Sequence, residues 1–156
     1  MGIRKTAKLV REFLDSDNWK YRYINNKEYI SFVGDVHSSH CLSCLRVFIT
    51  VTDKEVMCYY ELPVSAKECL PQMAEFVMRA NYGLNTGSFM LDFNDGELRF
   101  KVATSHQALE GSPTEEMHRL LYVPMGTIKT YARGIVGVLS GYESAVEAVR
   151  KCEEND

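Results

Sequence analysis

Hydrophobic and polar residues alternate most strictly over residues 89–102, and this alternation predicts a β-hairpin. Within it, Asp95-Gly96 fits a two-residue type I′ turn, which requires positive φ at both central positions. Such a turn fixes the register and places Asp92 opposite Arg99, where the opposite charges attract. One face of the hairpin is expected to be buried, because all of its large side chains are apolar: Phe89, Leu91, Phe93, Leu98, Phe100 and Val102.

Shorter alternating runs precede the hairpin and predict further strands over residues 19–24, 28–36, 45–52 and 56–62. The second face of this sheet, which an antiparallel sheet usually turns to water, also carries aromatic and methionine side chains. Such a face is typical either of a binding surface or of a surface covered by a helix, here the helices expected within residues 114–140. The candidate protein-binding residues on it are Tyr29, Phe48, Met57, Tyr59 and Met90.

Helices are predicted where apolar residues recur at helical spacing. These segments are residues 4–15, the residues after Pro71, and residues 127–140 and 143–153. Residues 112–115, Ser-Pro-Thr-Glu, form a capping-box sequence that predicts another helix start, and Pro124 is expected to break or kink that helix. The order α-β-β-β-α-β-β-α-α, with three or four strands before the second helix, predicts an α+β fold with a twisted antiparallel sheet of five to six strands and flanking helices. We expect the C-terminal helices, residues 113–153, to pack on the sheet or to lie at a dimer interface.

Composition narrows the class of protein. The chain has 156 residues, so we expect one domain spanning residues 1–156, and its 46% hydrophobic content is enough for a core. A net charge of −3 argues against a general nucleic-acid binder. No apolar run approaches the about 20 residues that cross a bilayer, so no membrane association is expected. The five cysteines and the lack of a secretory signal favour reduced thiols and a cytoplasmic location.

The strongest candidate for a metal site is a single short segment. His37, His40, Cys41 and Cys44 are ligand types that tetrahedral zinc prefers, and they lie within eight residues. Structural zinc sites usually combine two ligand pairs from separate segments, however, so we expect a polar loop and no cofactor. A small metal-binding or redox-responsive protein using this loop is the alternative function. The nucleophile-elbow, P-loop, dinucleotide-binding and zinc-protease motifs are all absent from the sequence, and we therefore expect no enzyme.

The loop from Asn81 to Gly87-x-Phe89, leading into the Asp-Gly hairpin, resembles the YbjN family of bacterial proteins, labelled as sensory transduction regulators. The resemblance is close over residues 79–103. It implies a fold similar to type III secretion chaperones, whose members are homodimers that bind unfolded segments of client proteins. The longer C-terminal region with Pro124 departs from that pattern. We therefore expect a non-enzymatic protein-binding domain, chaperone-like or regulatory, that forms a homodimer and binds a protein client.

Overall fold

The computed structural model describes residues 2–154 and contains one six-stranded antiparallel sheet. Its strands lie side by side in the order β1-β2-β3-β4-β6-β5, so β1 and β5 form the two edges. The fold is α+β, as predicted. The strands are β1 (Arg22–Asn25), β2 (Tyr29–His37), β3 (Cys44–Thr52), β4 (Val56–Ser65), β5 (Ser88–Leu91) and β6 (Glu97–Thr104).

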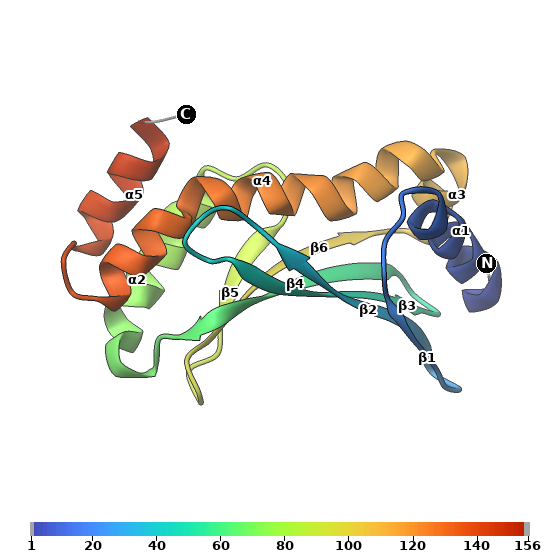
Figure 1. The fold of residues 1–156 in the computed structure, drawn as a ribbon, viewed down its shortest axis with the longest axis horizontal. Coiled ribbons are helices and arrows are strands. Elements are labelled where there is room, and N and C mark those ends of the chain that lie inside the picture. Colours follow the sequence, from blue (N-terminus) through green and yellow to red (C-terminus); the bar gives the residue numbers. More distant parts are fainter. Residues whose placement is uncertain (1, 155–156) are drawn as a thin grey trace.

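The helices leave one face of the sheet without a helical cover. Figure 1 shows α4 running along the sheet, with α1 and α3 near one end and α2 and α5 near the other. The opposite face carries no helix within the part of the chain that the structure describes. The helices are α1 (Ile3–Ser16), the 3-10 helix η1 (Lys67–Cys69), α2 (Leu70–Tyr82), α3 (His106–Gly111), α4 (Pro113–Leu139) and α5 (Ala145–Glu154).

The core lies between α4 and the covered face of the sheet. Alternate residues of the strands, such as Phe32, Tyr60 and Phe100, are almost fully buried there. Leu120 and Ile128 of α4 are fully buried as well. Each such side chain contributes about 1.5–3 kcal/mol when it leaves water. Helix α4 therefore packs on the core face of the sheet. It does not cover the second face, so the interpretation in which helices of residues 114–140 cover that face is wrong.

Pro124 was expected to break or kink a helix. It does not break the helix, because α4 is a single helix of 27 residues that contains this proline. Proline removes the backbone donor for the residue four positions earlier. In the same turn, the hydroxyl of Tyr60 donates to the backbone oxygen of Leu121, so the sheet supplies a donor to this part of the helix. The capping box is also absent, since the side chain of Ser112 makes no capping hydrogen bond.

The register of the hairpin differs by two residues from the prediction. Phe89 lies opposite Phe100, and Met90, not Asp92, lies opposite Arg99. The connection is a wider loop of five residues, 92–96, in which the N–H of Gly96 donates to the oxygen of Asp92 at 2.7 Å. Since side chains alternate with a period of two, this shift preserves the two faces. Phe93 is the exception: it falls in the loop and is 60% exposed.

Local and tertiary bonds explain why the two-residue turn is not used. The carboxylate of Asp92 accepts from the N–H of Asn94 at 2.8 Å, and that of Asp95 accepts from the N–H of Glu97 at 2.9 Å. Aspartate side chains commonly stabilise loops in this way. Gly96 has φ of +77° and its oxygen accepts from the N–H of Ala66 at 2.8 Å. The wider loop is therefore bonded to the connection between β4 and α2.

Candidate functional site

The uncovered face of the sheet, called the open face here, brings together three of the five predicted binding residues. Phe48 and Tyr59 lie directly opposite each other on β3 and β4. Met57 lies two residues from Tyr59 on the same face, and the hydroxyl of Tyr59 donates to its sulfur at 3.3 Å. Tyr29 and Met90 share the face but lie at its margins, opposite Thr52 and Arg99 respectively. The centre of the open face is thus an aromatic and methionine cluster.

Two cations border this cluster. The guanidinium of Arg99 and the ammonium of Lys101 lie 5.7 and 5.6 Å from the centre of the Tyr59 ring. Cations within about 6 Å of an aromatic ring face are attracted by its quadrupole. Tyr59 itself is only partly exposed. The aromatic cluster is therefore bordered by two positive charges on the β6 side.

A row of alternating charges crosses the open face next to the cluster. The strand registers place Asp35 opposite Arg46, Arg46 opposite Glu61, and Glu61 opposite Arg99. The Arg46 and Asp35 side chains form an ion pair at 3.5 Å. The pKa of Arg99 is raised above its ordinary value, mainly by a hydrogen bond with Glu97. The negative charges of Glu97 and Glu61 raise it further. The row reads negative, positive, negative, positive from β2 to β6.

The predicted metal ligands do not converge. His37 and Cys44 lie opposite each other on β2 and β3, on the open face, and Cys41 is exposed in the loop between them. His40 instead turns inward, and its Nδ1 accepts from the N–H of Leu42 at 3.1 Å. Burial, followed by the charge of Lys129 on α4, lowers the pKa of His40. Across residues 2–154, no three His, Cys, Asp or Glu side chains are grouped as metal ligands would be.

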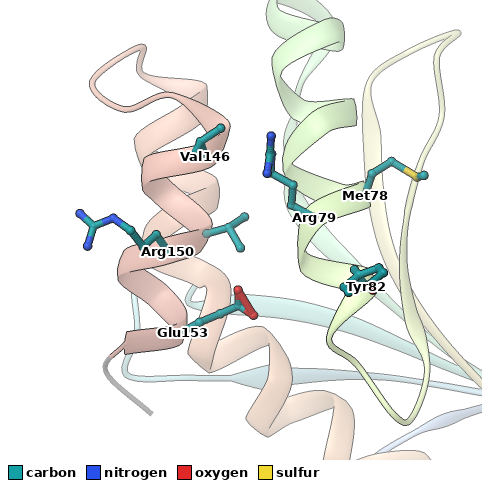
Figure 2. Close-up of a pocket in the computed structure, with 7 residues that line it drawn as sticks. Met78, Arg79, Tyr82, Val146, Arg150 and Glu153 are labelled. Carbon is teal, nitrogen blue, oxygen red and sulfur yellow. The ribbon is translucent and has the colours of Figure 1, made fainter.

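A second apolar surface, missed at the sequence level, lies between α2 and α5. A groove of about 550 Å³ is lined by side chains of both helices, and Figure 2 shows Glu153 pointing into it. On its α2 side, Tyr82 is 95% exposed and Met78 is 72% exposed. The available signal was their four-residue spacing, away from the buried side of α2. The groove is lined by Met78, Arg79, Tyr82, Val146, Val149, Arg150 and Glu153.

The cations of this groove are already paired on their own helices. Arg79 contacts Glu75 at 2.8 Å, and Arg150 contacts Glu147 at 2.8 Å and Glu154 at 2.5 Å. Paired charges of this kind, four or three residues apart on one helix, are worth only about 0.3–0.5 kcal/mol each. The groove is therefore mainly apolar, and its two arginines are already neutralised on their own helices. The carboxylate of Glu153, which accepts from the Tyr131 hydroxyl at 3.1 Å, is its remaining charge.

Comparison with known proteins gives no identity. No protein-family model matches the chain, and neither curated proteins nor solved structures yield a match. The resemblance to the YbjN family stays a prediction. Among the helices that the structure describes, even the longest, α4, lacks the combination of length and apolar character that a membrane span requires. The function must therefore be argued from the surfaces themselves.

Proposed function

We propose that the protein is a non-enzymatic protein-binding domain that forms a homodimer through the open face of its sheet. The observation that carries this proposal is the aromatic and methionine cluster of Phe48, Met57 and Tyr59, which no described helix covers. An apolar cluster of this kind on an otherwise charged sheet face is typical of an interface. It agrees with what the resemblance to the YbjN family implies.

The charge row makes the open face complementary to itself. A two-fold axis parallel to the strands, between β3 and β4, exchanges β2 with β6 and β3 with β4 between two copies. Asp35 then faces Arg99 of the second copy, and Arg46 faces Glu61 of the second copy, so each charge meets its opposite. The same operation places Phe48 against Tyr59 of the second copy. Self-complementarity of this kind is what a two-fold dimer requires.

Face-to-face packing of two sheets is a common arrangement in proteins. Two sheets pack about 10 Å apart, with their strands within about 30° of each other. At this distance the side chains of the two open faces meet, and the Tyr59 rings and Met57 side chains fill the space between them. Paired charges at the margin would contribute to orientation more than to affinity.

Size-exclusion chromatography with light scattering tests the homodimer. The unmodified protein is expected to show twice the mass of one chain, and Phe48→Glu the mass of one chain, because a carboxylate would be buried without a partner. Gln72→Glu is the matched control, since it adds the same charge at an exposed position on α2. A protein that is monomeric at all accessible concentrations and unchanged by Phe48→Glu would contradict the proposal.

A charge exchange then tests the two-fold geometry. Arg46→Glu and Glu61→Arg are each expected to weaken the dimer, because each places like charges together across the axis. The double variant restores opposite charges at both places and is expected to restore the dimer. If the dimer persists in all three variants, the copies associate through another surface, of which the groove between α2 and α5 is the first to examine.

A further inference from the structure

The two edge strands of the sheet differ in whether their outward-facing backbone groups are hydrogen-bonded. At β5, the side chain of Asn81 bonds both outward-facing groups of Phe89: its amide donates to the Phe89 oxygen at 2.9 Å, and its oxygen accepts from the Phe89 N–H at 2.8 Å. Asn81 thus occupies the place that a further strand would take. Exposed edges invite pairing with other chains, and proteins commonly block them. Among the residues that the structure describes, no side chain bonds the edge at β1 in this way.

The register of β1 shows which of its groups are free. The N–H of Asn26 donates to the oxygen of Tyr29 at 3.1 Å, so these two residues form a hydrogen-bonded pair. Bonded and non-bonded pairs alternate along an antiparallel ladder. Arg22 and Ile24 therefore bond to β2, while the N–H and C=O groups of Tyr23 and Asn25 point away from the sheet. Within residues 2–154, no protein group bonds these outward-facing groups.

Basic side chains of α1 flank the same edge. Arg4, Lys8 and Arg11 line a small cleft of about 140 Å³ together with Tyr23 and Asn25 of β1. The guanidinium of Arg11 lies 4.3 Å from the centre of the Tyr23 ring, directly beside the edge. Lys8 has a weak contact with Glu12 at 3.9 Å.

Most of these cations lack a carboxylate partner. In the described part of the chain, no carboxylate lies within ion-pair distance of Arg4 or Arg11, nor of Arg22 on the other side of β1. The chain as a whole has a net charge of −3, so this cluster is a local exception. Cations without a carboxylate partner, beside backbone groups without a strand partner, favour a ligand that carries both carboxylates and a peptide backbone.

We propose that the β1 edge binds an extended acidic peptide segment as a seventh strand. The backbone of that segment would bond the outward-facing groups of Tyr23 and Asn25, which is the usual mode of strand addition. Because side chains alternate along a strand, every second residue would face α1, where Arg4, Lys8 and Arg11 receive carboxylates. The intervening residues lie on the side of Ile24, which is 44% exposed, and are therefore small or apolar.

This surface is separate from the proposed dimer interface. It uses the backbone of an edge strand and the side chains of α1, whereas the dimer uses the side chains at the centre of the open face. A monomeric protein would overturn the proposed function and leave the edge site intact. The two proposals can therefore fail independently.

Fluorescence anisotropy with a labelled peptide in which Glu and Val alternate over six residues tests this site. The full chain is expected to bind it, and to bind a peptide with Gln in place of Glu at least about tenfold more weakly, since charged hydrogen bonds are replaced by neutral ones. Combining Arg4→Glu with Arg11→Glu is expected to abolish binding of the Glu peptide and to create binding of the matching Lys peptide. Equal affinity for the Glu and Gln peptides would overturn the acidic specificity.

A proline substitution separates strand addition from simple charge attraction. Asn25→Pro removes an outward-facing N–H and no bond to β2, so the fold is expected to persist and binding to fall about tenfold. Asn25→Ala keeps the N–H and is the matched control, and thermal melting of both variants verifies folding. Unchanged binding by Asn25→Pro, or equally strong competition by a single-stranded oligonucleotide, would show a general polyanion surface and overturn the proposal.

Discussion

The block at the β5 edge gives the most direct test of the structure. Asn81→Ala removes two hydrogen bonds to Phe89, the N–H contact at 2.8 Å and the oxygen contact at 2.9 Å. Neutral hydrogen bonds contribute about 0.5–1.5 kcal/mol each, so the pair is worth about 1–3 kcal/mol. Alanine favours the helix more than asparagine does, which offsets up to about 0.7 kcal/mol.

The net loss of stability is therefore expected to be about 0.3–3 kcal/mol. For a chain of this size, that lowers Tm by about 1–12 °C. Urea unfolding followed by circular dichroism measures the free energy of unfolding of both proteins. Asn85→Ala is the matched control, because Asn85 is exposed in the loop between α2 and β5.

Asn81→Asp distinguishes the two bonds. Aspartate keeps an acceptor for the Phe89 N–H but places a second acceptor against the Phe89 oxygen. We expect it to be more destabilising than Asn81→Ala at neutral pH, and to recover part of the difference when acid protonates the carboxylate. If Asn81→Ala is at least as stable as Asn85→Ala in urea unfolding, Asn81 does not stabilise the edge and the reasoning is refuted.

Three further predictions concern the core, the hairpin loop and the His40 loop. Tyr60→Phe removes the buried hydroxyl that donates to Leu121 and is expected to cost about 1–3 kcal/mol in urea unfolding. Gly96→Ala is expected to cost more than about 1 kcal/mol in the same assay, because φ is +77° and a Cβ would lie 2.2 Å from the nitrogen of Lys67. The pKa of His40 is lowered in the folded state, so the unfolded chain binds this proton more readily. Stability should therefore fall as the pH drops below about 6.5, and His40→Asn should reduce that dependence in unfolding at pH 7.5 and 5.5.

The faces of the sheet were predictable from the sequence, and the register of the hairpin was not. Alternation has a period of two, so Phe89 and Phe100 must share a face in either register. Besides the local bonds of Asp92 and Asp95, the observed register includes a bond between Gly96 and Ala66, which are 30 residues apart along the chain. A pattern within the hairpin carries no information about that bond.

The candidate surfaces were also predictable only in part. Phe48, Met57 and Tyr59 come together because strands β3 and β4 are joined by a short turn, which alternation and turn residues predict. The groove with Tyr82 and the open edge at β1 depend instead on which surfaces remain without a neighbour. These surfaces form because α5 packs beside α2 and because α1 lies next to β1. The local pattern of apolar and polar residues predicts neither arrangement.

The two proposed surfaces can be occupied at the same time, and this has a measurable consequence. An axis between β3 and β4 places the β1 edges of the two copies at opposite ends of the dimer, since β1 is the outermost strand. Each dimer should then bind two acidic peptides independently. Calorimetric titration is expected to give one peptide per chain, and Phe48→Glu to abolish the dimer without changing peptide affinity. If Phe48→Glu removes both activities while the fold melts normally, the peptide is held across two copies, and the edge of β1 is only half of its site.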